Sequence, residues 1–223
     1  NIYKNTKVVF TCTGHEENDF FKIWAANQVK KGKKYILCEH GGSWEKSEYF
    51  GILEKTSDLF LSWNQYNFNN CIQVPINIDL KKKKILKKNL GNKILILANE
   101  TTWYCPRIQT GPISSQILQD YELWKTFTTK LLNPIRKNIT FRPHPVDFFW
   151  DLKKKYSEEI GKNYISGKKK FEEDLNQSKI VVNTSLQTTF YQSMKKGVPT
   201  IILFDRKILN VDSKLLKLKD LFI

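Results

Sequence analysis

The first 75 residues alternate short apolar runs with polar turns and one amphipathic stretch. Residues 7–13 form an apolar run that predicts a buried strand, and residues 34–39 predict another. Between them, residues 20–30 place apolar side chains at helical spacing, after Asn18 and Asp19 as capping residues. Strand, helix and strand at this spacing predict a βαβ unit.

The second half of the chain alternates strand and helix patterns more regularly. Strand patterns cover residues 93–98, 139–141, 179–183 and 198–204, and helical patterns cover residues 115–132, 148–160, 171–176 and 189–196. The first of these strands is continuous and apolar, which is typical of a central strand in a parallel sheet. The alternation predicts a doubly wound parallel sheet.

A lysine-rich stretch without a convincing period, residues 76–92, separates the two halves. We interpret it as a linker between a first lobe, residues 1–75, and a second lobe, residues 93–223. The first lobe also contains a short strand pattern over residues 57–63. Because the chain begins at Asn1 and ends on an apolar pair, we expect a fragment whose first lobe is incomplete and whose second lobe is truncated.

The composition favours a folded chain with an affinity for anions. Hydrophobic residues make up 40% of the 223 and aromatic residues 13%, which supports a sizeable core and excludes wholesale disorder. Lysine and arginine exceed aspartate and glutamate by 37 to 22, and the net charge of +15 favours nucleotide phosphates, anionic lipid headgroups or nucleic acid as partners. Much of the excess lies in lysine runs, which are most often solvated surface.

The four cysteines are widely spaced and contain no C-x-x-C pair, which argues against a zinc ribbon or a redox motif. They are Cys12, Cys38, Cys71 and Cys105. Because the sequence carries no secretory signal, we expect reduced thiols and a cytoplasmic location. No apolar run approaches the ~20 residues needed to span a bilayer.

A proline-stiffened loop, Arg142-Pro143-His144-Pro145, follows the strand pattern of residues 139–141. Each proline fixes its own φ and keeps the preceding residue out of helix, so the loop presents a guanidinium beside an imidazole. Arginine can clamp a phosphate with two hydrogen bonds, histidine is a titratable donor, and ligands bind at this end of strands in open α/β sheets. The alternative is a stiff turn whose histidine only caps a carbonyl.

A hydroxyl-rich loop follows the strand pattern of residues 179–183 and leads into a helix. Its polar residues are Asn183, Thr184, Ser185, Thr188 and Thr189. Helix N-termini bind phosphates through unpaired N–H groups, although ordinary N-capping by Thr184 or Ser185 is the alternative. Because this loop and the loop of Arg142 follow consecutive strand patterns, we expect them to converge on one crevice and form a phosphate site.

A third strand-end loop, Glu39-His40-Gly41-Gly42, closes the second strand of the first lobe. Its two glycines allow a ligand to approach closely or the backbone to take a positive φ. His40 is a candidate general base, or a donor to a phosphate or carboxylate, and an ordinary turn is the alternative. Because it lies in the first lobe, we expect it to stand opposite the phosphate pocket of the second.

The order of these motifs resembles that of GT-B glycosyltransferases from bacterial surface-polysaccharide loci, which build O-antigen and other surface carbohydrates. The resemblance covers about residues 15–205, and its strength lies in the order of short motifs. These motifs are Trp24-Ala25-Ala26, Gly32-Lys33-Lys34, His40-Gly41-Gly42, Pro106-Arg107, Ser115-Gln116, Tyr121, Phe127, Thr188-Thr189-Phe190 and Pro199-Thr200-Ile201-Ile202. It implies an α/β, GT-B-like fold with two Rossmann-like lobes, residues 1–75 on the acceptor side and residues 93–223 binding the nucleotide donor.

More distantly, the His-Pro motif and the hydroxyl loop resemble sialyl-, polysialyl- and Kdo transferases and teichoic-acid polymerases. The residues that this likeness implies as ligands of a CMP or CDP phosphate are His144, Ser185, Thr188 and Thr189. It makes His40 an acid/base or acceptor-side residue. The sequence departs from the sialyltransferases because no Asp or Glu occupies an obvious counterpart of their catalytic acid, for which Glu39, Glu45 and Glu100 are stand-ins.

The loops and the resemblance together define the candidate site. The donor-binding candidates are Arg107, Arg142, His144, Pro145, Asn183, Thr184, Ser185, Thr188 and Thr189. The catalytic candidates are His40 and Glu39, beside the loop glycines Gly41 and Gly42. The cationic side chains would offset the negative charge that develops on a leaving phosphate. Because no D-x-D motif is present, we predict no metal site.

The predicted function is transfer of a sugar from a CMP- or other NDP-linked donor to a glycan or lipid-linked glycan of a bacterial surface polysaccharide. The donor is a substrate, so no separate cofactor is expected. The alternatives are CDP-polyol phosphotransfer of the teichoic-acid type, a donor-binding lobe without activity, and a basic nucleic-acid-binding module. No recognisable nucleic-acid-binding motif is present, so we expect no nucleic-acid partner. Lys81 to Lys88 would support peripheral attachment to the inner face of the plasma membrane, and a solvated linker explains them equally well.

Overall fold

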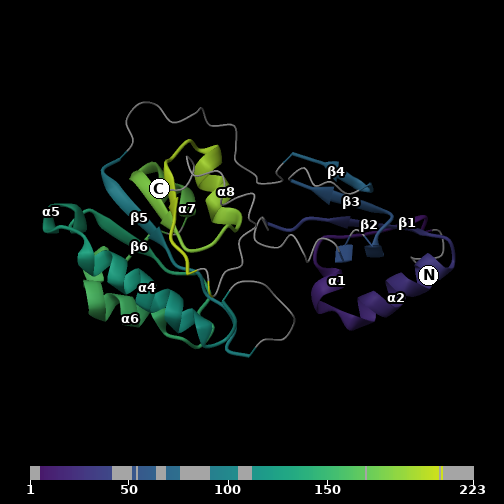
Figure 1. Cartoon of the computed structure of the whole chain (residues 1–223), viewed down its shortest axis with the longest axis horizontal. Helices are drawn as coiled ribbons and strands as arrows, with labels where there is room; N and C mark the ends of the chain where they lie inside the picture. Colours follow the sequence, from purple (N-terminus) through teal and green to yellow (C-terminus); the bar gives the residue numbers. More distant parts are fainter. Residues whose placement is uncertain are drawn as a thin grey trace. The chain divides into compact units, whose positions relative to one another are not determined.

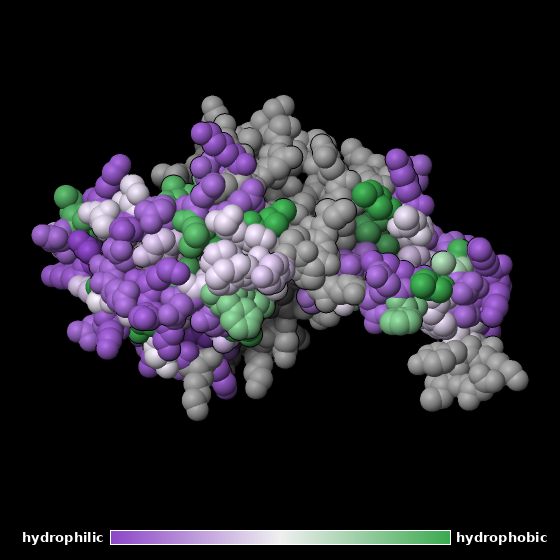
Figure 2. Space-filling model, turned by 90° about the horizontal axis from the view of Figure 1, so that it is seen from below, coloured by the Kyte–Doolittle hydropathy of each residue, from purple (hydrophilic) through white to green (hydrophobic). Residues whose placement is uncertain are grey.

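The computed structural model divides the chain into two compact units, Asn1–Ile78 and Asp79–Ile223, each described by itself (Figure 1). It describes residues 6–41, 52–53, 55–63, 69–75, 91–104, 112–168, 170–205 and 207. The linker expected over residues 76–92 lies almost wholly outside these ranges, so its boundaries stay predictions. On the described part of the face in Figure 2, hydrophobic side chains occur in small groups among hydrophilic ones.

Unit 1 contains a parallel sheet with strand order β1-β2-β3-β4. Its strands are β1 (Val8–Thr11), β2 (Lys34–Cys38), β3 (Leu59–Ser62) and β4 (Cys71–Gln73), and the helices described over their whole length are α1 (Gly14–Glu17) and α2 (Asp19–Lys30). The predicted βαβ unit is confirmed, because α2 connects β1 to its parallel neighbour β2. The Asn18 side chain accepts a hydrogen bond from the Phe21 N–H at 2.9 Å, which caps α2.

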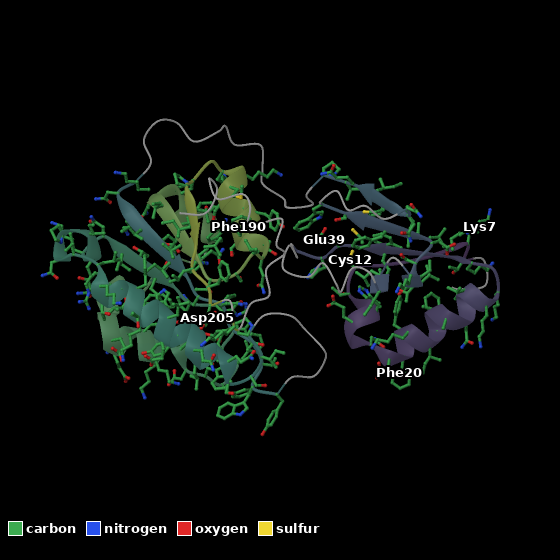
Figure 3. The ribbon with its side chains drawn as sticks, viewed as in Figure 1. Lys7, Cys12, Phe20, Glu39, Phe190 and Asp205 are labelled. Atoms are coloured by element: carbon green, nitrogen blue, oxygen red, sulfur yellow. The ribbon has the colours of Figure 1, made fainter. Side chains whose placement is uncertain are left out.

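The first strand is less buried than its apolar sequence predicts. Only Val9 of β1 is buried, whereas Val8 and Phe10 are exposed. The described strands place β1 at an edge of the sheet, with β2 as its partner. The prediction of a buried strand is therefore wrong for this element, because the face that carries Val8 and Phe10 is open to solvent. Phe20 on α2 also points outward (Figure 3).

Unit 2 contains a second parallel sheet with strand order β6-β5-β7-β8. Its strands are β5 (Lys93–Leu97), β6 (Ile139–Arg142), β7 (Ser178–Asn183) and β8 (Thr200–Ile202). Its helices are α4 (Gln116–Lys130), α5 (Asn133–Arg136), α6 (Leu152–Ile160), the 3-10 turn η1 (Lys162–Tyr164), α7 (Phe171–Asn176) and α8 (Thr188–Lys195). The continuous apolar strand β5 lies in the interior of the sheet, as predicted, between β6 and β7.

Alternate residues of β5 build the core on both faces of this sheet. Ile96 packs with residues of α4 and α6, including Trp124 and Tyr156, and Leu95 packs on the opposite face with Leu175 of α7. The α/β class with doubly wound parallel sheets is confirmed, and it is consistent with a GT-B-like, two-lobe Rossmann-type fold. No helix in the described parts of the chain has the length and apolar composition needed to cross a membrane.

The helix predicted over residues 148–160 begins later, at Leu152. Phe149 and Asp151 have φ values of 73° and 53°, which a right-handed helix does not allow. The residues before Leu152 therefore belong to the loop that follows β6. This loop carries the His-Pro motif and is part of the candidate site.

Candidate functional site

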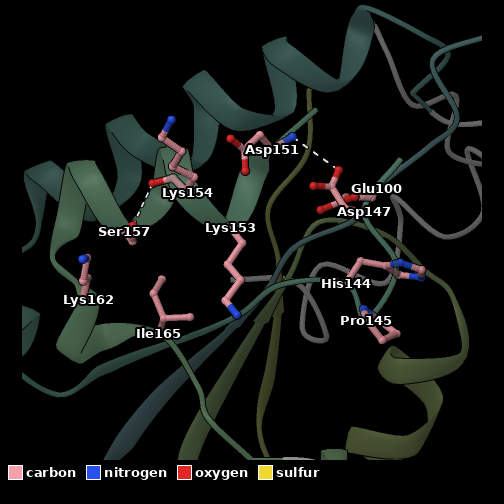
Figure 4. A pocket seen from close by; sticks show the side chains of 10 residues that line it. All are labelled: Glu100, His144, Pro145, Asp147, Asp151, Lys153, Lys154, Ser157, Lys162 and Ile165. Atoms are coloured by element: carbon pink, nitrogen blue, oxygen red, sulfur yellow. Dashed lines mark hydrogen bonds between the residues drawn. The ribbon is translucent and has the colours of Figure 1, made fainter. Parts of the chain in front are cut away.

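A pocket of about 480 Å³ opens in unit 2 where β5 and β6 end (Figure 4). Its lining comes from the loops after these strands, from α6 and from the segment around η1. The lining residues are Glu100, His144, Pro145, Asp147, Asp151, Lys153, Lys154, Ser157, Lys162 and Ile165. Ligands of open α/β sheets bind at the carboxyl ends of the strands, so this is the expected place for a site.

His144 and Pro145 lie at one side of the pocket, and Lys162 and Ser157 lie at the other (Figure 4). The His144 Nδ1 atom lies 2.9 Å from the Val146 carbonyl oxygen and 3.2 Å from the Val146 nitrogen. The imidazole also packs beside Phe148, with ring centroids 5.4 Å apart. These contacts hold the ring through Nδ1 and leave Nε2 without a hydrogen-bond partner among the described residues.

The pocket brings opposite charges close together. Three ammonium groups, those of Lys153, Lys154 and Lys162, share it with the carboxyl groups of Asp147, Asp151 and Glu100. Burial raises the pKa of Glu100, whereas the hydrogen bond from the Phe148 N–H lowers it. The arrangement can therefore bind an anion through the lysines and His144 and can accept hydrogen bonds from ligand hydroxyls through the carboxylates.

Arg142 lies at the end of β6 but is held by residues outside the pocket lining. Its Nη1 atom donates to Asp174 Oδ2 at 2.6 Å and to the Lys168 carbonyl oxygen at 3.0 Å. The guanidinium also lies 6.0 Å from the ring centroid of Phe171. Asp174 is buried and accepts a further hydrogen bond from Ser166 Oγ at 2.6 Å. These contacts give Arg142 a structural role that sequence reasoning did not anticipate.

Residues of the hydroxyl-rich loop after β7 form hydrogen bonds with one another. Asn183 Nδ2 donates to Thr189 Oγ1 at 3.0 Å, and the Ser185 N–H donates to Asn183 Oδ1 at 3.2 Å. Asn183, Thr184 and Ser185 are buried. Helix α8 begins after Gln187 without a side-chain cap, so the alternative of ordinary N-capping by Thr184 or Ser185 is wrong.

The loops after β6 and β7 open at the same edge of the sheet, on either side of β5. Strand β5 lies between β6 and β7, so the two strands are about 10 Å apart. The described lining includes His144 and Pro145 and no residue of the loop from Asn183 to Thr189. Consecutive order in the sequence did not mean adjacency in the sheet, and the expected convergence of the two loops on one crevice stays a prediction.

Asp120 is a buried carboxyl group that the sequence analysis missed. It lies on α4, is 6% exposed, and its Oδ2 has no hydrogen-bond partner among the described residues. Burial raises its pKa to about 7, the charge of Asp205 adds to the rise, and the Thr184 hydroxyl partly offsets it. Its position three residues after Ile117, on the apolar face of the helix, was the signal that marked it for burial.

In unit 1, Glu39 and His40 follow β2 but differ in environment. Glu39 is buried, and its Oε2 accepts hydrogen bonds from Ser62 Oγ at 2.6 Å and from the Trp63 N–H at 2.8 Å. His40 is exposed. Gly41 has a φ of 74°, so this glycine adopts the positive φ that the sequence analysis allowed for it. Glu39 is thus fixed to the end of β3, whereas the His40 ring is accessible.

Cys38 lies beside these residues, and its thiol is expected to resist alkylation. Burial raises its pKa to about 11, and Cys12 and Glu39 add to the rise. Because the thiolate is the nucleophile, iodoacetamide at pH 8 should modify Cys38 about a hundredfold more slowly than an ordinary cysteine. Peptide mapping by mass spectrometry measures the rate. The urea-unfolded chain is the control and should react at the ordinary rate, and equal rates in both states would contradict the prediction.

Several predicted positions lie outside the described residues: Gly42, Glu45, Arg107, Cys105 and Lys81 to Lys88. Cys12, Cys38 and Cys71 are free thiols. In the described ranges, no three His, Cys, Asp or Glu side chains are grouped as ligands for a metal ion.

Comparison with known proteins places the chain among transferases. A family model described as LIC12162 family transferase matches residues 1–222. No curated protein gives a significant match.

Proposed function

The chain belongs to the LIC12162 family of transferases, and from this premise we propose that it transfers a sugar from a nucleotide-activated donor to a bacterial surface glycan. The observation that carries the proposal is the pocket at the end of β5 and β6, where His144 and three lysines surround a space of about 480 Å³. Pockets of this size accept a nucleotide-sized ligand. The donor is a substrate in this proposal, and the acceptor is a glycan or a lipid-linked glycan.

The cationic groups of the pocket suit the chemistry of a phosphate leaving group. As the bond between the sugar carbon and the phosphate oxygen breaks, the electron pair leaves with the phosphate, and negative charge develops there. Lys153, Lys154 and Lys162 would stabilise that charge, and His144 Nε2 would donate a hydrogen bond to it. The acceptor hydroxyl attacks the sugar carbon and passes its proton to a base, the role that the sequence analysis predicts for His40.

Glu39 fits a positioning role better than direct contact with substrate. Its carboxylate is buried and bonded to the end of β3, whereas the neighbouring His40 is exposed. We propose that Glu39 fixes the turn that carries His40. The positively charged groups proposed to face the phosphate are lysines, and the proposal includes no metal. Activity that survives EDTA would support this part, and loss that Mg²⁺ or Mn²⁺ restores would contradict it.

Replacing His144 by alanine is expected to weaken nucleotide binding about 10- to 100-fold and to leave the thermal unfolding temperature unchanged. The ring is partly exposed, and its hydrogen bond and ring contact among the described residues are with its own loop, so little packing is lost. Isothermal titration with CMP, CDP, UDP and GDP measures the affinity, and stronger binding of CDP than of CMP would favour the CDP-polyol alternative.

A pair of lysine variants provides the matched control. Lys153→Ala removes a charge from the pocket, whereas Lys179→Ala removes one near the start of β7, at the other edge of the sheet. The first should weaken nucleotide binding and the second should not. Unchanged binding in both His144→Ala and Lys153→Ala would overturn the assignment of the pocket, and a large loss of stability in His144→Ala would make this histidine a structural residue.

A further inference from the structure

Two neighbouring loops of unit 2 expose aromatic side chains beside the pocket. Trp103 and Tyr104, in the segment after β5, are 48% and 83% exposed, and Phe149, in the loop after β6, is 80% exposed. Val146, in the same loop as Phe149, is also exposed. Large exposed apolar side chains that gather at one place mark an interaction site more often than scattered ones do.

Three contacts hold the two loops side by side. The Trp103 and Trp150 rings are stacked, with centroids 4.9 Å apart and planes at 10°. Trp150 Nε1 donates to the Thr101 carbonyl oxygen at 2.9 Å, and the Phe148 N–H donates to Glu100 Oε2 at 3.2 Å. The exposed rings of both loops therefore belong to one surface.

Trp103 presents one open face of a fixed ring. Its other face lies against Trp150, which is buried, so the exposed half of the side chain is the face and edges turned away from Trp150. A ring held in this way loses little freedom when a ligand stacks on it. It offers a flat apolar surface without the cost of ordering a mobile side chain.

Phe149 is exposed, and its backbone has an unfavourable conformation. Its φ of 73° lies in the left-handed region, which is unfavourable for a bulky side chain. Strained residues of this kind persist at binding sites, where the surrounding structure fixes them. Here the buried neighbours Trp150 and Leu152 anchor the loop while the phenyl ring faces solvent. The ring contributes little to the core, so folding does not account for its position.

Two carboxyl groups belong to the loop that carries Phe149. Asp147 and Asp151 belong to the loop of Phe149 and also line the pocket. Carboxylates accept hydrogen bonds from hydroxyl groups, and aromatic faces pack against apolar C–H surfaces. A sugar chain carries both features, an apolar ring face and many hydroxyl donors. Lys153, Lys154 and Lys162 of the same pocket balance the charge of the two aspartates, so it is the hydroxyl-accepting carboxylates beside aromatic faces that favour a polyhydroxylated ligand.

We infer that Trp103, Tyr104 and Phe149 form an aromatic platform that binds the glycan acceptor beside the pocket. Calling the glycan an acceptor rests on the proposed function. Glycan binding by the platform does not depend on it. Because Asp147 and Asp151 belong to the loop that carries Phe149 and also line the pocket, a bound glycan would reach the donor site without leaving unit 2.

The test uses the full chain and a panel of neutral tetrasaccharides, built from glucose, mannose, galactose and N-acetylglucosamine, at millimolar concentrations. Binding is followed by NMR shifts of the loop residues. The double variant Tyr104→Ser/Phe149→Gly removes two rings, and glycine accepts the positive φ without strain, so the loop should keep its shape. The affinity of the best-bound sugar should fall about tenfold. The control Phe20→Ser removes an exposed ring from unit 1 and should have no effect.

Each outcome decides between the ideas. Loss of sugar binding in the double variant, with unchanged binding of CMP or CDP, supports the platform. If nucleotide binds but no sugar shifts the loop residues, the platform is wrong and the proposed function stands. If sugar binds and nucleotide does not, the platform stands and the donor site fails. Binding to phosphatidylglycerol vesicles that is lost in the double variant, without any effect on sugars, would identify a lipid surface instead and overturn the inference.

Discussion

Raising the pH from about 4 to about 8 is expected to lower the free energy of unfolding by up to about 4 kcal/mol through one group, the buried Asp120. Its pKa is about 7 in the folded chain against an ordinary value near 3.8. Between these values the folded state holds a proton that the unfolded state has released, so stability falls as the pH rises. The loss is complete above pH 7, where the folded state must bury a charged carboxylate near Asp205.

Urea unfolding of the wild type and of Asp120→Asn at several pH values measures this effect. The variant keeps the shape of the side chain but carries no charge, so its stability should lack the Asp120 contribution and should exceed that of the wild type at pH 8. The exposed Glu158→Gln serves as the control and should keep the wild-type pH dependence. Between pH 5 and pH 7, the stability of the wild type should fall more steeply than that of Asp120→Asn. Equal slopes would show that Asp120 is charged in the folded protein throughout this range.

Replacing Arg142 by methionine is expected to cost about 3 kcal/mol of stability. The substitution removes the partner of Asp174, whose side chain is 3% exposed, and leaves its charge buried. The hydrogen bond from Ser166 Oγ remains and keeps the loss at the lower end of the usual range. The measurement is the free energy of unfolding in urea at pH 7.

The control for this prediction is Lys22→Met, which breaks an exposed ion pair with Asp19 on α2 and should change stability little. Nucleotide binding by Arg142→Met distinguishes the two roles of the arginine. Binding that persists in the folded variant would support a purely structural role. A stable variant that no longer binds nucleotide would instead identify Arg142 as the phosphate clamp expected from the sequence.

The sequence predicted the elements that depend on local pattern. The apolar run of β5 marked a central strand, and Asn18 marked the start of α2. Strand order, in contrast, depends on which strands pair through their backbones. No local pattern in the sequence shows that β5 lies between β6 and β7. The start of α6 was missed because the positive φ at Phe149 and Asp151 is imposed by the loop rather than by residue type.

In the candidate site, too, the sequence predicted what depends on local pattern and missed what depends on the fold. His144 was found because prolines on both sides fix a strand-end loop, which is a local signal. The partner of Arg142 was missed because Asp174 lies 32 positions downstream and gives no signal in the sequence around the motif. The lysines of α6 were missed because lysine runs in this chain are usually solvated, and only the fold shows that Lys153 and Lys154 line the pocket.

The interior position of β5 has a consequence for how the protein is made. Ile96 pairs with Phe141 on one side and with Val182 on the other, partners that lie more than forty and more than eighty positions downstream. A ribosome therefore releases this apolar strand well before either neighbour has been translated. Such distant pairings slow folding and leave aggregation-prone apolar segments exposed during biosynthesis. A chaperone that binds extended apolar peptides would shield β5 during that interval.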